Sequence, residues 1–196
     1  MTTAAQLSRA DLWSLEEYSE KREGFREAVL EHKKNRNVML GDHVQLLFED
    51  RQTIHYQIQE MLRIEKVYES AGIQEELDAY NPLIPNGDNW KCTMLIQYTD
   101  VDERKVKLQQ LVKIESLIWV KVGDGDKILA IADEDMERSN DDKTSAVHFM
   151  RFQFDAASLQ AAKSGAEITI GCDHTAYLTE QVLAASARDS LIQDFS

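Results

Sequence analysis

The sequence has little cysteine, proline and glycine: of 196 residues, 2 are cysteine, 2 are proline and 8 are glycine. Cys92 and Cys172 form no C-x-x-C pair, which excludes a disulfide scaffold and an iron–sulfur cluster held by this chain alone. We expect both to be reduced thiols, buried in strands of a cytoplasmic protein. No run of about 18 apolar residues and no secretory signal pattern occurs, so neither a membrane-spanning helix nor a leader is expected.

Basic residues are also scarce. The chain has 22 basic and 35 acidic residues, which gives a formal net charge of −13. Phosphate backbones and anionic lipids repel such a chain, so neither nucleic acid nor a membrane is expected as a partner. The densest basic segment holds Lys33, Lys34 and Arg36. We interpret it as a solvated helix end, because cations there complement the helix dipole.

The motifs of several enzyme classes are missing. No G-x-G-x-x-G, Walker A or G-x-S-x-G pattern occurs. The five histidines never show H-x-x-x-H spacing, and none follows a glutamate at the E-x-x-H interval of di-iron bundles. The sequence therefore indicates no cofactor.

The acidic loop of residues 133–143 invites comparison with a calcium-binding loop. Asp133, Asp135 and Glu137 occupy the first, third and fifth positions of an EF-hand count. Arg138 and Thr144, however, stand where that loop requires glycine and glutamate. We therefore predict an ordinary solvated loop.

Periodicity and turn signals predict a mixture of helices and strands, with enough hydrophobic residues (43%) for one core. The expected helices cover about residues 14–34, 50–68, 73–80, 100–112, 155–165 and 179–193. The expected strands cover about residues 38–40, 43–48, 91–99, 117–122, 127–132, 146–154 and 167–172. Hairpin signals without regular βαβ spacing favour an α+β fold, a mainly antiparallel sheet packed with several helices. We expect a single domain over residues 1–196, with a possible subdivision near 81–90, where both prolines lie.

The stretch FEDRQTIHYQIQEMLRIE, residues 48–65, is predicted to be mostly an amphipathic helix capped by Asp50. A helical projection places Gln57 and Glu65 inside the apolar sector, and Glu60 at its border. It places four polar residues on the solvent face: His55, Gln59, Arg63 and Lys66. An unpaired buried carboxylate costs several kcal/mol, so Glu65 needs a cation, a metal or strong donors, or must escape at the helix end. A buried hydrogen-bond network and a ligand or metal site both remain open.

A second polar cluster, Cys172-Asp173-His174-Thr-Ala-Tyr177, follows the last predicted strand. Binding residues often lie where a strand ends. His43 also begins a strand, and with His174 and one helix carboxylate it would form a metal triad if the fold brought the three together. Ordinary turn and capping roles are the alternative.

Two long motifs, LLFEDRQTIHYQIQEMLRIE and IQEELDAYNPLIP, resemble the signature of an uncharacterised bacterial family, domain of unknown function 3501. The shorter SAVHFMRF, CDHTAY and DLWSLEEY are similar to further segments of that family, so the resemblance spans nearly the whole chain. It implies that eight residues stand at family positions: His43, Glu49, Arg51, Gln57, Glu60, Arg63, His174 and Tyr177. His55 and Cys172 depart from the family pattern.

The resemblance implies no established activity. Members of the family are often encoded beside a rubrerythrin-like protein and an iron–sulfur oxidoreductase, which suggests service to a redox-stress system whose redox centres lie on those partners.

Two hypotheses follow for the function. The first is an accessory or binding protein of that redox-stress system, with a small ligand bound near Arg51, Gln57, Glu60, Arg63 and Tyr177. The second is a metal- or ligand-dependent enzyme that uses Glu60 or Glu65 with His174, with His43 and His174 as candidate metal ligands. A purely structural or regulatory role is a third reading.

Overall fold

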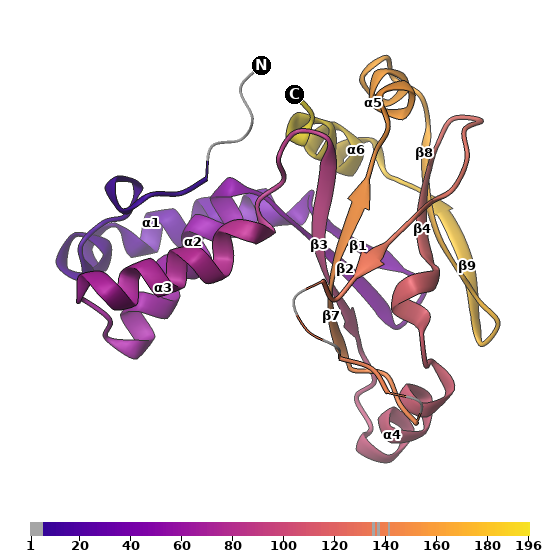
Figure 1. Ribbon diagram of the computed structural model, residues 1–196, viewed down its shortest axis with the longest axis horizontal. Coiled ribbons are helices and arrows are strands. Elements are labelled where there is room, and N and C mark those ends of the chain that lie inside the picture. Colours follow the sequence, from indigo (N-terminus) through magenta and orange to yellow (C-terminus); the bar gives the residue numbers. More distant parts are fainter. Residues whose placement is uncertain (1–5, 135, 137, 141) are drawn as a thin grey trace.

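The computed structural model describes residues 6–134, 136, 138–140 and 142–196. The fold is α+β, as predicted, and its strands pair in antiparallel fashion. They form two sheets, where one was expected. Helices α1, α2 and α3 lie on one side of the sheets, and the other helices lie near the two ends of the strands (Figure 1).

Sheet A has five strands in the order β1-β2-β3-β7-β6, and sheet B has four in the order β5-β4-β8-β9. The strands of sheet A, in that order, are Asn37–Leu40, Val44–Glu49, Asn89–Ile96, Val147–Gln153 and Ile131–Ala132. The strands of sheet B, in that order, are Ile128–Leu129, Ile118–Val122, Ile168–His174 and Tyr177–Val182.

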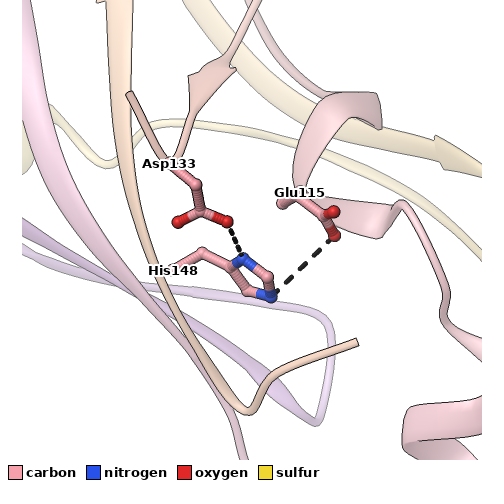
Figure 2. Close-up of side chains that lie close together, drawn as sticks. All are labelled: Glu115, Asp133 and His148. Carbon is pink, nitrogen blue, oxygen red and sulfur yellow. Dashed lines mark hydrogen bonds and ion pairs between the residues drawn. The ribbon is translucent and has the colours of Figure 1, made fainter. Parts of the chain in front are cut away.

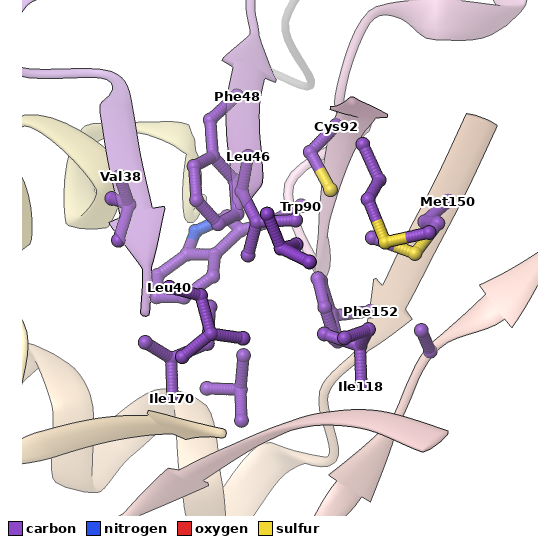
Figure 3. Packing of buried hydrophobic residues seen from close by; sticks show 14 of the residues in the cluster. Val38, Leu40, Leu46, Phe48, Trp90, Cys92, Ile118, Met150, Phe152 and Ile170 are labelled. Atoms are coloured by element: carbon purple, nitrogen blue, oxygen red, sulfur yellow. The ribbon is translucent and has the colours of Figure 1, made fainter. Parts of the chain in front are cut away.

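The main hydrophobic core lies between the two sheets. Alternate residues of β3 face it: Trp90, Cys92, Met94 and Ile96. Sheet B adds Ile118, Val120 and Ile170, and Figure 3 shows Ile118 and Ile170 close to the side chains of sheet A. The indole of Trp90 donates to the carbonyl oxygen of Leu191 at 2.9 Å and stacks on Phe195 at 5.2 Å between ring centroids. This large aromatic pair therefore holds the C-terminal segment on the core.

A second, smaller hydrophobic cluster is formed by α2 (Arg51–Glu65) and α3 (Ser70–Tyr80) with Leu7 and Ile84, and α1 (Leu15–Lys34) adds the partly buried Leu15. The predicted caps are present: Ser14 accepts from the N–H of Glu17 at 3.2 Å, and Asp50 accepts from that of Thr53 at 2.9 Å. The single domain with its possible subdivision near 81–90 stays a prediction.

Three further helices complete the fold: α4 (Val101–Gln110), α5 (Ala156–Lys163) and α6 (Ala185–Leu191). The predicted helix over 179–193 is wrong in its first half, where β9 pairs with β8 through a tight turn that sets His174 opposite Tyr177. Alternation in Tyr-Leu-Thr-Glu-Gln-Val and pairing with a neighbouring strand outweigh helix propensity there. In the described part of the chain, no helix combines the length and apolar character needed to span a bilayer.

Arg36 is buried, with 2% of its surface exposed, so the predicted solvated helix end is wrong for this residue. Its guanidinium donates to the carbonyl oxygens of Phe48, Glu49 and Ser190 and pairs with Asp194 at 2.5 Å. These contacts place Arg36 between the end of β2 and the C-terminal segment. A buried cation is tolerated there because acceptors surround it.

Candidate metal centre

Glu60, a predicted site residue, joins α1 to α2. Its carboxylate accepts from Tyr18 Oη at 2.7 Å and from two nitrogens of Arg22 at 2.7 and 2.9 Å, and Arg63 adds contacts at 3.2 Å. The hydrogen bonds from Arg22, followed by those from Arg63 and Tyr18, lower the pKa of Glu60 to about 2. These contacts are those of a structural brace between two helices.

The buried face of α2 is rotated from the predicted one. Gln59, expected on the solvent face, is wholly buried: it accepts from the N–H of Trp13 at 2.7 Å and donates to the Trp13 carbonyl oxygen at 3.4 Å. Glu65, expected in the apolar sector, is exposed at the helix end, and Gln57 is half-buried. The segment before α1 covers the face of α2 where Gln59 lies. The buried hydrogen bonds predicted for this helix are therefore made by Gln59 to the backbone of Trp13.

Arg51, Glu60 and His174 have different partners in different parts of the fold. Arg51 pairs with Asp11 at 2.5 Å, in the segment before α1. His174 Nδ1 accepts a backbone hydrogen bond from the following turn at 3.1 Å, so Nε2 is the nitrogen that donates to the Val112 carbonyl oxygen at 3.2 Å. The enzyme hypothesis that joined His174 to a carboxylate of α2 therefore has no support in the geometry.

Tyr177 and His43 hold the turn between β1 and β2. Tyr177 Oη donates to the Leu40 carbonyl oxygen at 2.7 Å and accepts from the His43 N–H at 2.9 Å. The His43 ring stacks on Tyr98 at 4.0 Å between centroids, with Nδ1 2.9 Å from the Gln97 carbonyl oxygen. Among the described residues, neither His43 nor His174 belongs to a group of three potential metal ligands.

Such a group is formed instead by Glu115, Asp133 and His148 (Figure 2). Glu115 lies in the short 3-10 helix η3 (Ile114–Leu117), Asp133 directly follows β6, and His148 is on β7. His148 Nδ1 is 2.6 Å from Asp133 Oδ2, and Nε2 is 3.8 Å from Glu115 Oε2. One possible ligand atom from each residue lies within 4.8 Å of the others.

The cluster is almost wholly enclosed. His148 has no exposed surface, and the side chains of Glu115 and Asp133 are 8% and 10% exposed. Thr144 Oγ1 lies between them, 2.8 Å from His148 Nε2 and 3.1 Å from Glu115 Oε2. Ser139 Oγ donates to the other oxygen of Glu115 at 2.8 Å. Two hydroxyl groups therefore complete a shell of oxygen and nitrogen donors.

Asp133 is held so that it orients the imidazole. Its backbone has φ +52°, a left-handed conformation that aspartate tolerates better than most residues. Its N–H donates to the Phe149 carbonyl oxygen at 2.8 Å, and Oδ1 accepts from Arg138 at 3.1 Å. The short contact with Oδ2 makes His148 Nδ1 the donor, which turns Nε2 toward Glu115.

The arrangement suits a divalent transition metal. A metal-bound histidine usually donates its other ring N–H to a carboxylate, as His148 does to Asp133. Imidazole and carboxylate together suit Mn²⁺, Fe²⁺ or Zn²⁺. A cavity of about 350 Å³ adjoins the cluster, with seven polar lining residues: Lys113, Glu115, Ser116, Asp133, Arg138, Ser139 and Asn140.

Sequence reasoning missed this cluster because its members are distant in the chain and meet only through the pairing of β6 with β7 and the position of η3. The sequence places Asp133 in a loop with calcium-type spacing, and Asp135 and Glu137 of that loop lie outside the described residues. One signal was available. His148 alternates with Met150 and Phe152, so it faces the core, and a buried histidine needs polar partners.

The profile of the family described as "Protein of unknown function (DUF3501)" matches residues 6–195. A crystal structure of a novel protein of unknown function from Burkholderia pseudomallei is also similar to this chain, with 44% sequence identity and a TM-score of 0.92. The match covers 98% of this chain and 100% of that one. No curated protein matches the sequence. Neither description states an activity.

Proposed function

This chain belongs to the DUF3501 family, whose description leaves its function unknown, and from the chain's own residues we propose that it is a metal-binding protein. It binds one divalent ion, Mn²⁺, Fe²⁺ or Zn²⁺, between His148 and Glu115, while Asp133 orients the histidine. The observation that carries this proposal is a fully buried imidazole between two carboxylates, at 2.6 and 3.8 Å.

The distances between the ligand atoms fit a bound ion after a small rearrangement of the side chains. Nitrogen and oxygen ligands lie about 2.0–2.2 Å from a bound Zn²⁺, so neighbouring ligand atoms stand roughly 3–4 Å apart. The Nε2–Oε2 distance of 3.8 Å is already in that range. Thr144 Oγ1 must turn aside or become a further ligand, because it now bonds to both groups. The adjoining cavity gives the ion a route in and a place for a small molecule to meet it.

The competing account is a buried polar network without metal. In that account His148 donates through Nδ1 to Asp133 and through Nε2 to the Ser145 carbonyl oxygen at 3.1 Å, and Thr144 donates to Glu115. The network account satisfies these groups directly, whereas an ion bound to Nε2 takes the imidazole donor away from the Ser145 carbonyl oxygen. The two accounts also differ in a measurable way, because only the metal-binding account predicts that added ions stabilise the folded protein.

The test is titration of chelator-treated protein with MnCl₂, ZnCl₂ and, without oxygen, FeCl₂, followed by calorimetry. We expect one ion per chain for the wild type, and at least about tenfold weaker binding for Glu115→Gln, which removes one ligand charge. Glu103→Gln, on the exposed surface of α4, is the matched control and should bind like the wild type. If folded wild-type protein binds none of the three ions, the metal-binding proposal is wrong and the buried polar network is the correct account.

The partners predicted from the sequence resemblance are a separate proposal. We propose that the protein serves a rubrerythrin-like protein and an iron–sulfur oxidoreductase in the cytoplasm. Two buried, unpaired cysteines are consistent with a reducing compartment. Co-purification of tagged chain with each of these two proteins tests it, and failure of both to bind would remove the redox-stress role without affecting the metal site.

A further inference from the structure

A cleft of about 700 Å³ lies between α3, with the 3-10 turn η2 (Asn81–Leu83) that follows it, and the outer face of sheet A. Its walls are mostly apolar, and the apolar lining residues include Tyr80, Pro82, Leu83 and Phe149. Volumes of roughly 300–1,000 Å³ with apolar walls and few polar groups are typical of small-molecule sites. The metal site lies on the opposite face of the same strand, because Phe149 alternates with His148.

Two cations stand side by side in this cleft. Lys91 on β3 is directly opposite Arg151 on β7, and like charges in that position destabilise a sheet. Arg151 is neutralised by Glu134 through contacts at 2.7 and 2.8 Å. Among the described residues, the side chain of Lys91 makes no hydrogen bond or ion pair, although Glu49 is its cross-strand neighbour on β2 and Glu134 and Asp88 attract its charge more weakly. Burial, and then the nearby Arg151, lower its pKa. Asp78, at the helical wall, is exposed and bonded to Gln74.

We propose that this cleft binds a small organic carboxylate with an apolar body, whose carboxylate pairs with Lys91 and whose body packs on Phe149 between Tyr80 and Leu83. The ligand supplies a direct ion-pair partner for Lys91 and covers the apolar walls of the cleft. Two of the segments noted in the sequence, IQEELDAYNPLIP and SAVHFMRF, provide the two walls. The proposal does not depend on the metal site.

The experiment uses two probes of the same shape, 3-phenylpropionate and 3-phenyl-1-propanol, titrated into the full-length chain by calorimetry and by two-dimensional NMR. We expect the carboxylate to bind at least about tenfold more tightly than the alcohol, with the largest shifts at Phe149 and Tyr80. Lys91→Gln should weaken carboxylate binding at least about tenfold and leave alcohol binding unchanged.

Lys121→Gln is the control, because Lys121 is likewise a half-buried strand lysine, on sheet B. It should bind both probes as the wild type does. Phe149→Ala should weaken both probes equally, which separates packing from charge. The proposal is overturned if neither probe binds below about 10 mM, if the two probes bind equally, or if Lys91→Gln binds the carboxylate as the wild type does.

Discussion

Replacement of Glu60 by glutamine removes one charge from the contact between α1 and α2 and keeps the shape of the side chain. The pKa of Glu60 is about 2, against an ordinary value of 4.5. A difference of about 2.5 units corresponds to about 3 kcal/mol of stabilisation at neutral pH. The partner side chains, Arg22 and Arg63, are 35% and 40% exposed, so solvent screening reduces the expected effect to about 1–2 kcal/mol.

The pH dependence follows from the direction of the shift. The folded-state pKa lies below the unfolded value, so this stabilisation is complete above about pH 5 and is lost as the pH falls toward about 2. At about pH 3 less than half of it remains. The difference in free energy of unfolding between the wild type and Glu60→Gln should therefore shrink steadily over this range.

Urea unfolding followed by circular dichroism, repeated from neutral pH to about pH 3, measures that difference. Glu65→Gln is the matched control, because it removes the same charge from the exposed end of the same helix and should cost less than about 0.5 kcal/mol. The reasoning is refuted if the difference for Glu60→Gln is independent of pH, or if the two variants lose equal stability.

Three further predictions concern single contacts. Gln59→Leu keeps the side-chain volume but leaves the backbone N–H and carbonyl of Trp13 without partners, so urea unfolding should show a loss of about 2–3 kcal/mol. Tyr177→Phe removes the hydroxyl that holds the β1–β2 turn and should cost about 1–3 kcal/mol, with faster amide exchange confined to that turn. Burial raises the pKa of Cys92 and of Cys172, so a disulfide reagent should modify both at least about 100-fold more slowly in native protein than in urea. Equal rates would show that the thiols are accessible.

Local signals carried most of the correct predictions. The caps at Ser14 and Asp50 were confirmed because a cap needs only the residue itself and the next three. Hairpin signals likewise indicated the antiparallel α+β class. Gln59 and Arg36 were misplaced because their environments come from segments distant in the chain, the first from the residues before α1 and the second from the C-terminal segment.

The candidate metal centre could not be predicted from local sequence signals either, because its residues are also brought together by segments distant in the chain. Glu115, Asp133 and His148 come together through the pairing of β6 with β7 and the position of η3, and neither follows from spacing. The strand pattern of β7 shows that His148 faces inward. The pattern gives no information about which carboxylates lie next to this histidine.

The central claim is a bound metal ion, and elemental analysis of protein purified without chelator tests it most directly. The account predicts close to one Mn, Fe or Zn per chain in the wild type, and loss of the metal in Glu115→Gln with the fold retained. Saturation with the preferred ion at about 100 times its Kd should add about 2.7 kcal/mol and raise the Tm by roughly 5–10 °C. A folded wild type that contains no metal and gains no stability from any of the three ions would contradict the account.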